Sequence, residues 1–120
     1  MKRIMVGVFV LATALVAIAV ALGATTLAIS ADKTKLAFNT KALVAKPGKV
    51  TITMVNPAVL PHNIAIKLTK SSKKALAMGQ IVGKGKTSKV TASLKAGSYI
   101  FYCSVPGHEA AGMWGVLKVK

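Results

Sequence analysis

The sequence predicts an all-β fold, an antiparallel β-sandwich with at most one short helix. Apolar and polar residues alternate in several short runs, which is the period-2 pattern of half-buried strands. Glycine and proline separate these runs at the spacing typical of a sandwich. The chain has 120 residues and no internal repeat or interdomain linker, so we expect one small domain.

Strands are expected where alternation is bounded by a turn signal, and at 98–103 because that segment is dense in β-forming residues. The run at 50–54 follows the Lys-Pro-Gly-Lys turn of residues 46–49, and the run at 89–94 ends at the Lys-Ala-Gly turn of residues 95–97. Residues 71–78 are the only good local helix candidate, of at most two turns. The predicted strands are 36–38 with 42–44 (one strand or a bent pair), 50–54, 63–68, 89–94, 98–103 and 115–119.

The first 30 residues differ in composition from the rest. Lys2 and Arg3 precede 26 uncharged residues, 4–29, which predict a signal peptide or an N-terminal membrane anchor. Small residues around Ser30 and Ala31 form an acceptable cleavage site, whereas the length of the run favours retention, so both outcomes stay open. Both place the expected domain, 31–120, in the periplasm or on the extracellular face of the membrane.

The charge is strongly positive. The formal net charge is +15, and residues 31–120 hold 15 lysines against Asp32 and Glu109, a net +13. Nucleic acid is disfavoured as a partner because the domain is expected to be exported, Arg3 is the only arginine, and no recognition motif is present. An acidic redox partner or an anionic envelope surface fits better, although the lysines also fit a merely solvated surface.

The residues able to carry chemistry are few. Cysteine occurs once and histidine twice, and all three stand at turns near the ends of predicted strands. Taken singly, each has an ordinary structural explanation, such as a buried cysteine acting as a small apolar residue. Together, a soft thiolate, two imidazoles and a weak thioether describe a trigonal copper site with a long axial ligand. The candidate metal ligands are His62, Cys103, His108 and Met113.

Three segments resemble the small blue copper proteins, the cupredoxins. Residues 102–113 resemble the copper loop of that family, with four residues between Cys103 and His108 and four more before Met113. This spacing is longer than in plastocyanin and closer to azurin-like and auracyanin-like loops. Residues 56–63 resemble the segment that carries the first histidine ligand, and residues 46–52 the turn and strand before it. The resemblance covers about residues 34–120.

The resemblance implies a cupredoxin-like Greek-key sandwich that binds one type 1 copper ion. Cys103, His62 and His108 would bind in a plane with Met113 axial, while Asn63 and Ser104 hydrogen-bond across the site. An apolar electron port is expected around the His108 ring. Its candidate residues are Val59, Leu60, Pro106, Ala110, Ala111 and Gly112.

The implied function is one-electron transfer between redox partner proteins by Cu(I)/Cu(II) cycling, and not catalysis. We expect a monomer, with possible membrane attachment through residues 4–29. A copper-delivery protein of the cell envelope with the same fold is the main alternative. An adhesive sandwich that has lost its metal is a second alternative. A hydrolase built on Cys103 and His108 is a third, for which Glu109 is the only nearby acid to orient the histidine.

Overall fold

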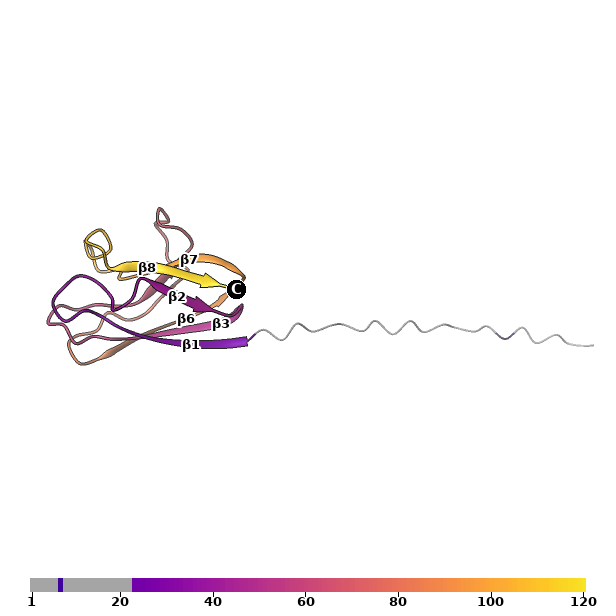
Figure 1. Cartoon of the computed structure of the whole chain (residues 1–120), viewed down its shortest axis with the longest axis horizontal. Helices are drawn as coiled ribbons and strands as arrows, with labels where there is room; N and C mark the ends of the chain where they lie inside the picture. Colours follow the sequence, from indigo (N-terminus) through magenta and orange to yellow (C-terminus); the bar gives the residue numbers. More distant parts are fainter. Residues whose placement is uncertain (1–6, 8–22) are drawn as a thin grey trace, which may run out of the picture.

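The computed structural model of the chain describes Gly7 and residues 23–120, and these form a two-sheet β-sandwich (Figure 1). One sheet has the strand order β1-β3-β6 and the other β2-β8-β7-β4-β5. The predicted all-β sandwich is therefore confirmed. The strands are β1 (Gly23–Ser30), β2 (Ala42–Ala45), β3 (Gly48–Val55), β4 (Ala65–Lys67), β5 (Ala77–Met78), β6 (Thr87–Leu94), β7 (Gly97–Tyr102) and β8 (Trp114–Val119).

The core lies between the two sheets, and β3 shows how the sequence builds it. Val50, Ile52 and Met54 alternate along the strand and are fully buried, whereas the residues between them face outward. Phe101 on β7 and Leu117 on β8 pack into the same cluster from the opposite sheet. Alternating hydrophobicity therefore fixes which face of each sheet points inward.

Among residues 23–120, four of the six strand pairings are antiparallel and two are parallel. β1 pairs in parallel with β3, and β2 pairs in parallel with β8. Parallel neighbours need a crossover connection. The chain provides the first one by leaving β1, adding β2 to the other sheet, and returning as β3.

The N-terminal boundary of the domain differs from the predicted one. The sandwich begins at Gly23, eight residues before Ala31, because residues 23–30 form β1 and pair over their whole length with β3. Ile29 of this strand is 4% exposed and belongs to the core. The strand has no charged residue, so charge alone does not separate it from the apolar run before it.

The predicted signal peptide or anchor otherwise falls on residues 1–22, of which all but Gly7 lie outside the described residues. In the part of the chain that the structure does describe, no helix has the length and apolar character needed to cross a membrane.

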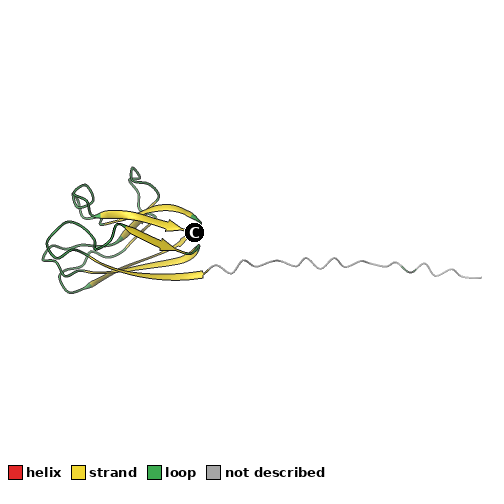
Figure 2. Ribbon diagram, viewed as in Figure 1, coloured by secondary structure: helices red, strands yellow, loops and turns green. Residues whose placement is uncertain are grey.

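The predicted helix at 71–78 does not form, and none of the described residues is helical (Figure 2). The segment is a loop that ends in β5. The Ser72 hydroxyl accepts a bond from the Thr69 N–H, and the Leu76 N–H donates to the Ile66 carbonyl of β4 instead of bonding within a helix. Such side-chain bonds to the local backbone compete with helix formation.

The first predicted strand is also shorter than expected. Phe38 contributes only an isolated bridge to Ala31, and within the predicted segment 36–44 regular pairing starts at Ala42, the first residue of β2.

The sandwich has two different ends (Figure 1). We call one the loop end, because the connections 31–41, 56–64, 79–86 and 103–113 lie there. We call the other the base; it holds Gly23, the tight turns at 46–47 and 95–96, and Lys120. The candidate metal ligands all lie at the loop end.

Gly115 on β8 is a sensitive packing position. A Cβ atom there would meet the Phe101 ring and lie 2.6 Å from the Lys41 carbonyl oxygen. We therefore expect Gly115→Ala to lower the free energy of unfolding of the metal-free protein by about 3 kcal/mol in urea titrations. Gly83→Ala is the control, because no atom lies within 4 Å of its Cβ position. Equal stability of the two variants would contradict this packing.

Candidate metal centre

Two loops bring the predicted ligands together. His62 belongs to the β3–β4 loop and exchanges two backbone hydrogen bonds with Val82. The His62 N–H donates to the Val82 carbonyl at 3.2 Å, and the Val82 N–H donates to the His62 carbonyl at 2.9 Å. Cys103 directly follows β7, and Met113 directly precedes β8, so two paired strands frame the second loop. The sheet therefore fixes both ends of the segment that carries three of the four ligands.

The second loop closes tightly on itself. The Cys103 N–H donates to the Met113 carbonyl, and the Met113 N–H donates to the His108 carbonyl, each at 3.1 Å. Gly107 and Gly112 have φ angles of 84° and 117°, a region that favours glycine. The two glycines therefore permit the backbone turns that bring His108 back over Cys103.

Three donor atoms converge in the interior. The Nδ1 atoms of His62 and His108 lie 3.1 Å apart, and the Cys103 Sγ lies 3.9 Å from the first and 3.6 Å from the second. His62 and Cys103 are each 1% exposed. Met113, the predicted axial ligand, is completely buried. Among the described residues, this is the cluster whose side chains are placed to hold a metal ion.

The spacing of the donors fits a trigonal ion. With the bond lengths of zinc sites, about 2.0 Å to nitrogen and about 2.3 Å to sulfur, taken as a guide for a first-row metal ion, planar trigonal coordination separates the nitrogens by about 3.5 Å and nitrogen from sulfur by about 3.7 Å. The separations in the protein, 3.1 Å and 3.6–3.9 Å, are close to these values. One thiolate and two imidazoles beside a thioether are the ligands that type 1 copper takes. The residues present therefore fit copper.

Burial sets the protonation of the metal-free site. It raises the pKa of the Cys103 thiol, although hydrogen bonds from the backbone N–H groups of Asn63 and Val105 act in the opposite direction. It lowers the pKa of His62, and the nearby His108 adds to that shift. At neutral pH the thiol is thus protonated and His62 is neutral. Metal binding then displaces the thiol proton while His62 is already in its ligating form.

The predicted contact between Asn63 and Ser104 is present as two hydrogen bonds. The Ser104 N–H donates to the Asn63 Oδ1 at 2.7 Å, and the Asn63 Nδ2 donates to the Ser104 Oγ at 2.8 Å. The same Nδ2 reaches the Gly79 carbonyl at 3.0 Å. Because each residue adjoins a ligand, these bonds tie the His62 loop to the Cys103 loop.

Asn56 is a positioning residue that the sequence interpretation missed. It is fully buried, its Oδ1 accepts from the Ala58 N–H, and its Nδ2 donates to the carbonyls of Leu60 and Val82, all at 3.0 Å. These bonds shape the loop that leads to His62. The Asn-Pro pair at 56–57 is a turn-initiating signal that pointed to such a role.

A second missed feature is an ion-pair clamp on the ligand loop. The Lys67 Nζ lies 2.8 Å and 2.7 Å from the two carboxylate oxygens of Glu109, and the Lys70 Nζ lies 3.0 Å from one of them. The Lys67 side chain is only 5% exposed and lies over the Tyr102 ring. Burial alone would raise the pKa of Glu109, but the two lysines outweigh it and lower that pKa. The carboxylate is thus engaged by lysines, so the hydrolase alternative loses its orienting acid.

Trp114, to which the sequence assigned no role, joins this clamp. Its ring lies under Lys70 at 4.2 Å and Lys41 at 5.2 Å, and its strand partner is Tyr102. None of these residues taken alone predicts the contacts from the sequence.

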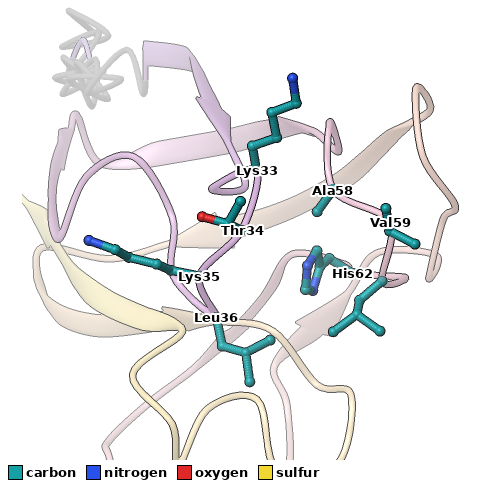
Figure 3. A pocket seen from close by; sticks show the side chains of 8 residues that line it. Lys33, Thr34, Lys35, Leu36, Ala58, Val59 and His62 are labelled. Atoms are coloured by element: carbon teal, nitrogen blue, oxygen red, sulfur yellow. The ribbon is translucent and has the colours of Figure 1, made fainter.

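The predicted port residues are exposed at the loop end. Val59 is 81% and Leu60 53% exposed, and Pro106, Ala110 and Ala111 are exposed as well. Gly112 and the His108 ring are partly exposed. Val59 and Leu60 also border a hollow of about 260 Å³ with His62 in its wall. Figure 3 shows the His62 ring between Ala58 and Leu36, with Lys33 and Lys35 extending away from it.

Comparison with known proteins agrees with this geometry. Residues 25–120 match the family of copper binding proteins described as the plastocyanin/azurin family. The chain belongs to this family. Its members are electron carriers rather than enzymes, so the family confirms the predicted resemblance and class of protein. His62, Cys103, His108 and Met113 form a cluster consistent with one type 1 copper ion. No curated protein sequence matches the chain at a significant level.

Solved structures of auracyanins share the fold. Dithionite-reduced auracyanin from the photosynthetic bacterium Roseiflexus castenholzii is 25% identical with a TM-score of 0.70, over 82% of this chain and 99% of that one. Auracyanin A, a "blue" copper protein from Chloroflexus aurantiacus, is 28% identical with a TM-score of 0.67, over 82% and 100%. Auracyanin B is 23% identical with a TM-score of 0.71, over 82% and 90%.

The Asn63–Ser104 bonds should control copper affinity. Asn63→Ala removes both bonds between the ligand loops and the bond to Gly79, so we expect copper affinity to fall by about 10–100-fold. Ser104→Ala is the matched control, because it keeps the backbone bond to the Asn63 Oδ1 and should lose less. Competition with a Cu(I) chelator measures both. An equal or larger loss in Ser104→Ala would contradict the role given to Asn63.

Replacing the acidic partner of the clamp should destabilise the protein more than replacing the buried lysine. Glu109→Gln leaves the buried Lys67 ammonium without its countercharge, so we expect a loss of about 3 kcal/mol in the free energy of unfolding. Lys67→Met leaves Glu109 paired with Lys70 and keeps an apolar stem against Tyr102, so we expect a loss of only about 1 kcal/mol. Denaturant titration of the metal-free variants tests this order. The reverse order would show that the clamp does not depend on the buried ammonium.

Proposed function

We propose that this chain carries single electrons between redox partner proteins outside the cytoplasm. The observation that supports this best is the convergence of His62, Cys103 and His108, in which His62 and Cys103 are buried and fully buried Met113 lies beside them. These ligands leave no open coordination position for a substrate, unlike a catalytic metal site. Such a site suits reversible oxidation and reduction of the ion itself.

The chain's own residues keep the site unchanged between the two oxidation states. Bound copper supplies the one-electron oxidation and reduction. Asn63 and Ser104 hold the two ligand loops together, and Asn56 fixes the approach to His62. Burial of Cys103 and His62 excludes water from the donor atoms. Because the ligands need to move little, the electron can exchange rapidly.

Electrons would enter and leave through the exposed apolar residues of the loop end. Small side chains such as Ala110 and Ala111 allow a partner's cofactor to approach the His108 ring closely. Val59 and Leu60 extend the same apolar surface from the other ligand loop. Lys33 and Lys35 flank the neighbouring hollow, so an acidic partner is favoured.

We place the domain outside the cytoplasm, attached to the membrane by the residues before Gly23. The support is the uncharged apolar run behind Lys2 and Arg3. Cleavage after Ser30 would remove β1, including the core residue Ile29. The fold therefore favours retention of the run over cleavage after Ser30.

Redox cycling in the presence of a Cu(I) chelator tests the proposal. The copper-loaded protein should pass through repeated reduction and reoxidation in stopped-flow experiments and retain its copper. Transfer to an acidic partner should slow as ionic strength rises, because exposed charges are screened. Loss of copper to the chelator at each reduction would instead indicate the alternative, copper delivery.

A pair of variants tests the port separately. Ala110→Glu places a charge in the apolar surface at the loop end and should slow transfer by about tenfold or more, because it disrupts close docking and repels an acidic partner. Ala96→Glu adds the same charge in the exposed β6–β7 turn at the base and should change the rate little. Equal rates for the two variants would contradict the proposed port.

A further inference from the structure

We propose that the base of the sandwich lies on an anionic lipid surface, with residues 4–22 in the bilayer, so that the metal centre faces away from the membrane. The inference rests on the proposed location outside the cytoplasm but not on electron transfer. Four features carry it: the short connection to the apolar run, the end at which β1 starts, the charge of that end, and an apolar hollow there.

The first feature is that the apolar run leads in sequence directly into strand β1. The part of the uncharged run that precedes β1 covers 19 residues, from Ile4 to Leu22. As an α-helix it would be about 28 Å long, close to the roughly 30 Å of a bilayer's hydrocarbon core. Strand β1 begins with the next residue, Gly23, which already pairs with Gly48. An anchored chain would therefore hold the start of β1 directly at the headgroups.

The second feature is the end of the sandwich at which β1 starts. Gly23 pairs with Gly48, and Gly48 pairs with Leu94 beside the β6–β7 turn. Figure 1 shows the C-terminus next to the start of β1, with the ligand loops at the opposite end. Strand β3 runs from the base to the loop end over eight residues, about 26 Å. Contact at the base thus leaves the metal ligands well clear of the lipid.

The third feature is charge. Both acidic side chains of the chain, Asp32 and Glu109, lie in loops at the loop end. Because lysines occur at both ends, their number alone does not show which end faces the membrane. The position of Gly23 at the base decides this. Clustered lysines next to a membrane segment attract anionic headgroups. The exposed lysines at or beside the base are Lys46, Lys49, Lys95, Lys118 and Lys120.

The fourth feature is how the base is shaped around the exit of the chain. The Lys46 side chain lies against Gly23, with its Cδ 3.6 Å from the Cβ position of that glycine. Between the two turns, a hollow of about 270 Å³ is lined by Pro47, Gly48, Ser93, Leu94 and Lys95, and its walls are mainly apolar. An apolar contact rimmed by ammonium groups matches the boundary between headgroups and acyl chains.

Lysine protection in bilayer discs tests the inference with the full chain. The protein is placed in discs of phosphatidylglycerol or of phosphatidylcholine, and its lysines are acylated by a water-soluble reagent and quantified by mass spectrometry. We expect the base lysines, Lys46, Lys49, Lys95, Lys118 and Lys120, to react about fivefold more slowly in the anionic discs. Lys33, Lys84 and Lys86 at the loop end should react equally in both. Salt at about 0.5 M should reduce the difference.

Matched triple variants complete the test. The triple variant Lys46→Glu, Lys95→Glu and Lys120→Glu should abolish the lipid-dependent protection of Lys49 and Lys118. The triple variant Lys33→Glu, Lys84→Glu and Lys86→Glu should leave that protection intact. Equal reactivity in both lipids, protection of the loop-end lysines instead, or protection of the base by an acidic polypeptide but not by anionic discs would each overturn the proposal. Because protection is read without redox chemistry, failure of electron transfer would leave this result unchanged.

Discussion

The close approach of three donor atoms in a dry interior is the constraint on which the rest of this structure depends. Two imidazole nitrogens lie 3.1 Å apart with a sulfur atom less than 4 Å from both. Unconnected side chains would not stay together in this way, so the surrounding polar contacts must hold them. Asn56 shapes one ligand loop, Asn63 and Ser104 join the two loops, and the Lys67–Glu109 pair fastens the second loop to β4.

The sandwich holds the metal ligands at one end and the start of β1 at the other. Adjacent strands β7 and β8 fix both ends of the second ligand loop, and the β3–β4 connection delivers His62 from across the core. All ligands therefore lie at one end. The opposite end, where β1 begins, is left free to meet a surface without disturbing the metal ligands.

The sequence was most informative where residues were rare or alternated cleanly. The ligands were recognisable because the chain has one cysteine and two histidines in turn-flanked positions. Strands β3, β6 and β8 were recognisable because inward and outward residues alternate, and β7 because its segment is dense in β-forming residues. Strand β1 was missed because it continues an uncharged run. The helix predicted at 71–78 was wrong because the segment instead forms a backbone hydrogen bond with β4, which outweighs its local helix propensity. The Lys67–Glu109 pair, 42 residues apart, was not predictable from either residue alone, since pairing across that distance depends on the fold.

The central claim is that Cys103 is the thiolate ligand of a type 1 copper ion, and the absorption spectrum tests it most directly. One equivalent of Cu(II) added to the purified protein should produce an intense visible band toward the red from thiolate-to-copper charge transfer, and Cys103→Ser should abolish that band. A colourless or weakly coloured complex, or an unchanged band in Cys103→Ser, would contradict the assignment.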